Sequence, residues 1–283
     1  MNDALRAAQN PMRRFSRRLR TRQRPRIKGP SFNRMIPNLL TMLGLCAGLT
    51  SMRYALEGRF GAAVVAIAVA AGIDGLDGRI ARMLKATSRF GAEFDSLADF
   101  LCFGVAPGFV LYLWTLQSAR GYGFTPCLMF AVCMALRLAR FNASIDVGPR
   151  PAYQNSFFTG VPAPAGAGMA LFPLFVGLEG RAMGWTWLEA LARHPIVSAV
   201  ALVGTAALLV STLPVWSFKN FKVPSHYVLP VLLGTGLYAA LLVADPWAAF
   251  AAAGLIYAGM LPFSVRSYRR LRAAAGPEMH PDG

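Results

Sequence analysis

The sequence predicts an all-α membrane protein, a polytopic helical bundle of about eight transmembrane helices, and three observations support this prediction. Hydrophobic residues make up 55% of the 283-residue chain, and the mean hydropathy is +0.43. Several apolar runs approach the roughly 20 residues that a helix needs to cross a bilayer. The third observation is that Lys and Arg gather before, between and after these runs. Soluble domains do not usually combine such a composition with several long apolar runs.

The N-terminal residues 1–34 are rich in arginine and hold 11 of the 29 Lys and Arg residues. One interpretation is nucleic-acid binding. The other is an arm that lies on the anionic cytoplasmic leaflet, which basic residues directly before a first span favour. A secretory signal peptide is not expected, because no short apolar core with a cleavage site follows the basic start. We predict a basic cytoplasmic arm and no nucleic-acid partner.

The apolar runs that follow predict the helices in order. The first, 35–52, has Pro37 near its start, where proline is tolerated. The second, 59–83, has an apolar part too short to span alone, so the helix must continue into the polar residues that follow it. The third, 93–117, contains Pro107 and is expected to kink there, because proline removes a helical hydrogen bond. The other predicted helices cover 123–141, 160–178, 195–214, 226–244 and 246–264.

The basic residues also indicate how the bundle is oriented. If the N-terminus is cytoplasmic and the helices alternate, 24 of the 29 Lys and Arg residues lie on the cytoplasmic side. This bias follows the positive-inside rule and favours an even number of helices with both termini in the cytoplasm. It places residues 74–99 at the cytoplasmic end. The five basic residues on the opposite side are Arg53, Arg59, Arg120, Arg181 and Arg193.

Four carboxylates lie within or beside the apolar runs, where a charge is costly and a functional role is the default interpretation. Asp74 and Asp77 are three residues apart, so they share one face of a helix, and Asp95 and Asp99, four residues apart, do the same. A fold at the basic turn 85–91 lets the two faces meet. Four carboxylates at one depth repel unless cations lie between them, and oxygen ligands suit Mg²⁺, Mn²⁺ or Ca²⁺. We predict one or two divalent cations, Mg²⁺ or Mn²⁺, with Ca²⁺ as a substitute in a crystal.

This segment resembles the signature of the CDP-alcohol phosphatidyltransferases, integral membrane enzymes of phospholipid synthesis. The pattern is D-x-x-D-G-x-x-A-R, eight further residues and G-x-x-x-D-x-x-x-D. It is matched at Asp74, Asp77, Gly78, Ala81, Arg82, Gly91, Asp95 and Asp99. Fixed positions at this spacing make a specific signal. The resemblance covers about residues 34–180 and implies a catalytic core over 35–180, with additional transmembrane helices over 181–265 and a cytoplasmic tail over 266–283.

The resemblance implies transfer of a phosphatidyl group from a CDP-linked lipid to an alcohol, with CMP leaving. Divalent cations would neutralise the diphosphate. Asp74, Asp77 and Asp95 are then the expected cation ligands, and Asp99 is the expected base for the acceptor hydroxyl, able also to ligate a second ion. The residues expected to bind the CDP-lipid are Asn38, Thr41, Asp74, Gly78, Ala81, Arg82, Gly91 and Asp95.

Some of these polar residues also have a structural interpretation. Asn38 and Thr41 fit helix capping and interhelical hydrogen bonding as well as contact with a diphosphate. Arg82 fits either a phosphate contact or the basic flank that the positive-inside rule explains. The cysteines and histidines form no ligand cluster by spacing.

A different part of the chain indicates which alcohol is the acceptor. The run L-R-L-A-R-F-N at 136–142, with the later G-V-P-A-P-A at 160–165, resembles the phosphatidylserine synthase branch of the family. This implies CDP-diacylglycerol and L-serine as substrates, with the serine carboxylate held by an arginine. The expected acceptor-binding residues are Arg137, Arg140 and Asn142. Glycerol 3-phosphate or inositol phosphate would also suit the two arginines, choline is a further alternative acceptor, and interfacial snorkelling is the structural interpretation of both side chains.

The resemblance also implies a membrane-lipid environment and a homodimer. A composition rich in Arg, Ala and Gly points to a bacterium, and so to its inner (cytoplasmic) membrane, with the active site facing the cytoplasm. The alternative class is a cation-coupled transporter that uses the Asp residues. Such a transporter would place its site near the membrane midplane between repeats, whereas this sequence shows no internal repeat and sets the Asp residues beside a basic turn.

Overall fold

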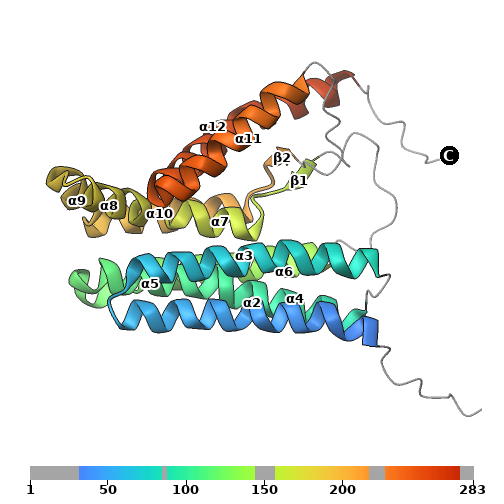
Figure 1. The fold of residues 1–283 in the computed structure, drawn as a ribbon, viewed down its shortest axis with the longest axis horizontal. Helices are drawn as coiled ribbons and strands as arrows, with labels where there is room; N and C mark the ends of the chain where they lie inside the picture. The colour runs from blue at the N-terminus through green and yellow to red at the C-terminus, as the bar shows by residue number, and fades with distance from the viewer. Residues whose placement is uncertain (1–31, 85–87, 144–156, 217–226, 275–283) are drawn as a thin grey trace, which may run out of the picture.

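The computed structural model describes residues 32–84, 88–143, 157–216 and 227–274. Within these ranges the chain is almost entirely helical (Figure 1). The all-α prediction is therefore confirmed. Residues 1–31 of the predicted arm and 275–283 of the predicted tail lie outside the described residues.

The first layer of the structure holds the N-terminal helices, which lie side by side in Figure 1. One of them is continuous from Arg89 to Trp114, although its central turns are π-helical. A 3-10 segment, η2 (Leu116–Tyr122), connects it to the last helix of the layer. The helices are α2 (Phe32–Leu56), α3 (Phe60–Met83), α4 (Arg89–Asp99), η1 (Phe100–Val105), α5 (Ala106–Trp114) and α6 (Thr125–Ala143).

The second layer covers the first and combines two bent pairs of shorter helices with the long helix α12. A short antiparallel pair of strands, with Phe158 opposite Val215, lies at one end of this layer. Helix α10 packs on α6, and α12 packs on α8. The elements are β1 (Phe157–Thr159), α7 (Ala163–Ala170), α8 (Phe172–Ala182), α9 (Thr186–Ala192), α10 (Pro195–Val210), β2 (Pro214–Trp216), α11 (Val228–Ala244) and α12 (Pro246–Ala274).

The count of eight transmembrane helices is not confirmed. The described residues contain five helices long and apolar enough to cross a membrane, or seven if each of two bent pairs is one span. The bends are 47° between α7 and α8 and 53° between α9 and α10. Pro173 and Pro195 each lie in the first turn of the second helix of a pair, where proline is favoured at a helix start. The 17-residue α11 is a shorter apolar helix.

At Pro107, where the sequence predicts a kink, the structure has a π-helical segment just before the proline. Pro107 lies in the first turn of α5, directly after the π-helical η1. Such segments are frequent at functional sites, and η1 begins immediately after Asp99. The close packing of η1 on α6 depends on Gly104, because a Cβ there would lie 2.9 Å from Met134 Cγ.

Candidate active site

Three of the four predicted carboxylates meet between α3 and α4. One carboxylate oxygen each of Asp74, Asp95 and Asp99 lies within 4.8 Å of the others, and the three side chains are half-buried. The two acidic faces therefore meet, although residues 85–87 of the predicted turn lie outside the described residues. Three oxygen ligands at this spacing fit a hard divalent cation such as Mg²⁺ or Mn²⁺. We call these three residues the carboxylate cluster.

The fourth carboxylate, Asp77, lies one turn further along α3 and outside the carboxylate cluster. Its side chain is buried, with 4% exposed. Thr41 Oγ1 on α2 donates a hydrogen bond of 2.8 Å to Asp77 Oδ2. Asp77 also lines both the narrow space at the carboxylate cluster and a larger pocket beside it. Thr41 therefore fixes the Asp77 carboxylate at the boundary between the two.

The larger pocket has a volume of about 390 Å³ and lies between α2, α3, α4 and the end of α6. Seven of the eight residues expected to bind the CDP-lipid line it, and the eighth, Asp74, lines the narrow space at the carboxylate cluster instead. The seven are Asn38, Thr41, Gly78, Ala81, Arg82, Gly91 and Asp95.

The two glycines of the predicted motif, Gly78 and Gly91, differ in how much space surrounds them. A Cβ at Gly91 would lie 3.0 Å from Asn38 Oδ1 and 3.1 Å from Ser88 Oγ, so glycine lets α2 approach the start of α4. Ser88 also caps α4, because its Oγ accepts a 3.0 Å hydrogen bond from the Gly91 N–H. A Cβ at Gly78 would meet nothing nearer than the Arg82 guanidinium at 3.8 Å. Gly78 therefore leaves the pocket open.

The predicted acceptor residues do not form a single group. Asn142 lines the 390 Å³ pocket, and its Nδ2 donates a 3.0 Å hydrogen bond to Ser96 Oγ on α4. Ser96 was missed by the sequence reasoning, although its place directly after Asp95 could have suggested it. The pair ties the end of α6 to α4 at the pocket wall.

Of the three predicted acceptor residues, Arg137 is the one that interacts with the carboxylate cluster. It is half-buried on α6 and interacts electrostatically with Asp99 and Asp74. Tyr257 of α12 is a further electrostatic neighbour, and its buried hydroxyl has no hydrogen-bond partner among the described residues. Nothing in the sequence pointed to Tyr257, because α12 lies beyond the motifs that the resemblance covered. Arg137 therefore places a charged donor near Asp99, and the Tyr257 hydroxyl lies near Arg137.

Arg140 has a different environment. Its guanidinium donates hydrogen bonds to the backbone carbonyls of Val210 at 2.9 Å and Ser211 at 3.2 Å, with Leu209 at 3.5 Å. Carbonyls at a helix C-terminus lack intrahelical partners and carry partial negative charge. Arg140 therefore holds the end of α10 against α6.

We expect Arg140→Gln to lower the stability of the protein. The shorter side chain leaves these carbonyls without their charged donor, at a cost of about 1–3 kcal/mol. The measurement is the Tm of the detergent-solubilised protein, with Arg79→Gln, an exposed position on α3, as the matched control. An unchanged Tm would mean that these hydrogen bonds contribute nothing to the fold.

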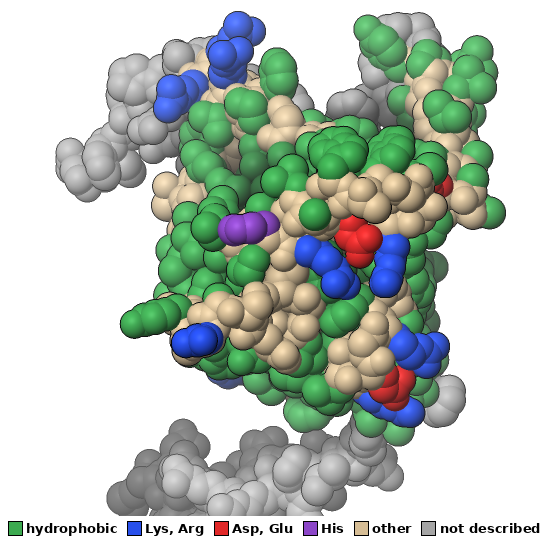
Figure 2. Space-filling view, turned by 90° about the vertical axis from the view of Figure 1, so that its left-hand side faces the viewer, with side chains coloured by type: hydrophobic (Ala, Val, Ile, Leu, Met, Phe, Trp, Pro, Cys, Tyr) green, Lys and Arg blue, Asp and Glu red, His purple; other side chains and the backbone are tan. Residues whose placement is uncertain are grey.

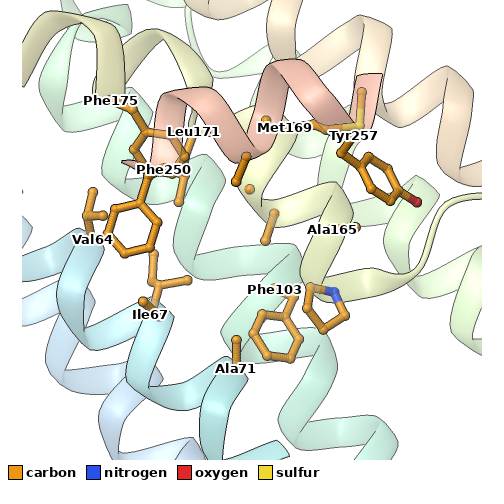
Figure 3. Close-up of a pocket in the computed structure, with 16 residues that line it drawn as sticks. Val64, Ile67, Ala71, Phe103, Ala165, Met169, Leu171, Phe175, Phe250 and Tyr257 are labelled. Carbon is orange, nitrogen blue, oxygen red and sulfur yellow. The ribbon is translucent and has the colours of Figure 1, made fainter. Parts of the chain in front are cut away.

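A second, apolar cavity of about 350 Å³ lies between the two layers of helices (Figure 3). Its walls come from α3, α7, α8 and α12 and include Ile67, Met169 and Phe250. Phe103 lines both this cavity and the space at the carboxylate cluster. The apolar cavity and the space at the carboxylate cluster are therefore adjacent, an arrangement that suits an amphiphilic substrate.

Comparison with known proteins agrees with this arrangement. The model of the CDP-alcohol phosphatidyltransferase family matches residues 34–263, so the match extends through most of α12. A CDP-diacylglycerol–serine O-phosphatidyltransferase from Mycobacterium leprae is 42% identical over 259 residues, which is 92% of this chain and 83% of the relative. The enzyme of that name from Mycobacterium tuberculosis strain H37Rv is 41% identical over 250 residues, covering 88% and 83%. One from Helicobacter pylori strain 26695 is 35% identical over 188 residues, covering 66% and 74%.

Proposed function

The chain belongs to the CDP-alcohol phosphatidyltransferase family, and on that basis we propose that it transfers the phosphatidyl group of CDP-diacylglycerol to the hydroxyl of L-serine. The products are phosphatidylserine and CMP. The name that the relatives carry supports serine as the acceptor. The observation that carries the proposal is the carboxylate cluster with the 390 Å³ pocket on one side and Arg137 close by.

The two cavities divide the CDP-lipid between them. The cytidine and diphosphate occupy the 390 Å³ pocket, where Gly78 leaves space and Arg82 offers a planar donor to a phosphate. The diacylglycerol chains occupy the apolar cavity beyond Phe103. The scissile phosphate then lies at the carboxylate cluster, between the two.

The carboxylate cluster would hold one or two divalent cations, Mg²⁺ or Mn²⁺, through Asp74, Asp95 and Asp99, with Asp77 at its edge. When bound, such a cation neutralises the diphosphate and stabilises the leaving phosphate. The chain supplies oxygen ligands alone at this position, which is the donor set that these cations prefer.

The other residues prepare serine for attack. Arg137 binds the serine carboxylate, since a guanidinium matches a carboxylate with two parallel hydrogen bonds. Because Arg137 lies near Asp99, a serine held there presents its hydroxyl to the Asp99 carboxylate, which takes the proton. The serine oxygen then bonds to the phosphorus that carries diacylglycerol, and the bond from that phosphorus to the bridging oxygen of CMP breaks. Arg140 keeps α6 in position from the end of α10.

We place this reaction at the cytoplasmic face of a bacterial inner membrane, with both termini in the cytoplasm. The distribution of 24 of the 29 basic residues supports this orientation by the positive-inside rule. L-serine is then available from the cytoplasm, and the apolar cavity faces the hydrocarbon region. The homodimer that the resemblance implies stays a prediction.

An acceptor panel tests the proposal. Purified, detergent-solubilised protein would receive CDP-diacylglycerol and Mg²⁺ or Mn²⁺ with serine, glycerol 3-phosphate, inositol phosphate or choline, and CMP release would be followed. We expect CMP only with serine. CMP release with another acceptor would contradict the assignment of Arg137 to serine binding, whereas the assignment of the carboxylate cluster to cation binding would stand. No CMP with any acceptor, in folded protein that still binds a cation, would favour the cation-coupled transporter.

Removal of divalent cations should abolish this activity. We expect EDTA to stop CMP release, and Mg²⁺ or Mn²⁺ to restore it, because the carboxylate cluster and the diphosphate otherwise repel each other. The measurement is CMP release against free metal concentration, with calorimetry of metal binding as an independent readout. In Asp95→Asn the binding heat should fall, since one of three oxygen ligands loses its charge. Full activity in EDTA would contradict the assignment.

A further inference from the structure

The end of the bundle opposite the carboxylate cluster carries four arginines, Arg53, Arg59, Arg181 and Arg193, which we call the distal arginine cluster. Phe60 begins α3 at this end and Asp74 lies 14 residues on, so the distal arginine cluster and the carboxylate cluster are about 21 Å apart along the helix. Figure 2 shows this end face-on, with basic and acidic side chains close together among hydrophobic ones. The distal arginine cluster contains four of the five basic residues that the sequence assigns to this side.

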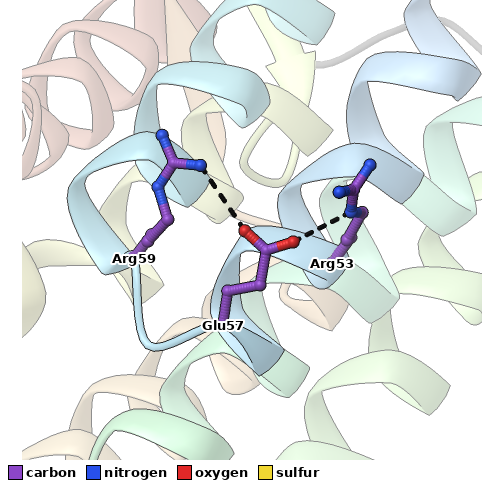
Figure 4. Close-up of polar contacts among 3 residues, drawn as sticks. All are labelled: Arg53, Glu57 and Arg59. Carbon is purple, nitrogen blue, oxygen red and sulfur yellow. Dashed lines mark hydrogen bonds and ion pairs between the residues drawn. The ribbon is translucent and has the colours of Figure 1, made fainter.

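Within the part of the chain that the structure describes, the ion pairs of the four arginines involve two carboxylates, Glu57 and Glu189. Arg53 Nε lies 2.9 Å from Glu57 Oε1, and an Arg59 guanidinium nitrogen lies 3.5 Å from Glu57 Oε2 (Figure 4). Glu189 lies between the other two arginines, with Oε1 at 3.5 Å from Arg193 Nε and 3.9 Å from Arg181 Nε. Within these four ion pairs, four positive charges face two negative ones, which leaves an excess of two positive charges in the pairs.

This excess charge borders a cavity. The cavity has a volume of about 180 Å³, and Arg59, Arg181, Arg193 and Glu189 form part of its lining. The rest of its lining includes apolar side chains and glycines, among them Trp114. The Arg193 guanidinium carbon lies 5.8 Å from the centre of the Trp114 ring. A cationic rim therefore surrounds an apolar floor.

The floor depends on Gly177. A Cβ at Gly177 would lie 2.6 Å from the Trp114 ring, so glycine at this position lets the indole approach α8 closely. The rim then comes from α8 and the residues around α9 on one side and from the α2–α3 connection on the other. Elements far apart in the sequence thus build one cavity.

We infer that this cavity binds the phosphate of an anionic phospholipid, a function separate from the proposed reaction. Arginine binds phosphate through paired donors, and the excess charge favours an anion. The apolar floor beside Trp114 favours a lipid over free phosphate, because the glycerol and upper chain carbons can cover it. The cavity also lies at an end of the spanning helices, at the depth of lipid headgroups. None of its lining residues lines the two catalytic cavities.

Lipid-dependent thermal stability of the full-length protein tests this inference. The Tm would be measured in detergent while phosphatidylglycerol, phosphatidylcholine or inorganic phosphate is titrated, since a ligand that binds the folded state raises Tm. We expect phosphatidylglycerol alone to raise the Tm. In Arg181→Gln with Arg193→Gln the apparent affinity should fall about 30-fold, because each basic residue near a headgroup contributes about a tenfold or smaller factor. Arg120→Gln, an exposed arginine that does not line this cavity, should behave like the wild type.

The variant Glu189→Gln distinguishes anion binding in the cavity from a role of the arginines in ion pairs alone. If the arginines serve only their ion pairs, this change should act like the loss of Arg181 and Arg193. If the cavity binds an anion, removal of the Glu189 charge should strengthen phosphatidylglycerol binding severalfold, since the excess positive charge rises. An equal response to phosphatidylcholine, an unchanged response in the double variant or an equal effect of inorganic phosphate would each overturn the inference.

Discussion

Asp99→Asn is expected to lower the rate of CMP release about a thousandfold, which is within the range that a general base contributes. The asparagine keeps the shape of the side chain and loses the charge and the ability to take a proton. Asp99 is placed where both losses matter, because its carboxylate lies in the carboxylate cluster and close to Arg137. The measurement is kcat for CMP release with saturating serine and CDP-diacylglycerol.

Glu93→Gln is the matched control for this variant. It makes the same chemical change on the same helix α4, at an exposed position that lines neither catalytic cavity, and its kcat should equal that of the wild type. CDP-diacylglycerol binding should persist in Asp99→Asn, because the lining of the 390 Å³ pocket is unchanged. A kcat within tenfold of the wild type would rule out Asp99 as the base.

Arg137→Gln is expected to lower kcat/KM for serine by about 30-fold or more, since loss of one partner of a desolvated charge pair costs about 2–5 kcal/mol. The loss should lie mainly in the KM for serine, while the KM for CDP-diacylglycerol stays near its wild-type value. The physical reason is that glutamine cannot offer the paired charged donors that a carboxylate accepts. Initial rates at varied serine and fixed CDP-diacylglycerol give the two constants.

Two comparisons make this result specific. Arg79→Gln removes a positive charge from the same end of the bundle at an exposed site, and it should leave both KM values unchanged. Tyr257→Phe removes the buried hydroxyl near Arg137 without changing the ring, and it should raise the KM for serine less than Arg137→Gln does. An equal rise in both KM values for Arg137→Gln would place Arg137 at the diphosphate and away from serine.

The spacing of residues along a helix predicted much of the site. Asp95 and Asp99 are four residues apart, so they had to share a face of one helix, and the structure places them together with Asp74. The residues that line the 390 Å³ pocket, among them Asn38, Gly78 and Gly91, were expected from the resemblance to the family and not from helical spacing. Apolar length likewise predicted the spanning helices, since the bilayer thickness sets it.

Local pattern was less informative where helices break. The predicted helix 160–178 is a bent pair of helices, and the predicted helix 195–214 is the second member of another pair, with α9 before it. Hydropathy alone does not distinguish a straight span from two helices that meet at a proline. The same limit applies to α11, which is apolar yet only 17 residues long. The number of spans therefore depends on backbone geometry that an average over a window of residues does not contain.

The sequence by itself determined which residues share a helix face, because the helical repeat is fixed, and with it the paired carboxylates and the apolar spans. Only the tertiary structure decided which faces meet. The sequence assigned both Arg137 and Arg140 to the acceptor, yet the Arg140 guanidinium reaches the end of α10, about 70 residues further along the chain. Tyr257 and the distal arginine cluster likewise acquire their surroundings from helices distant in sequence. Such contacts arise from the packing of side chains across helices, and no short-range pattern encodes them.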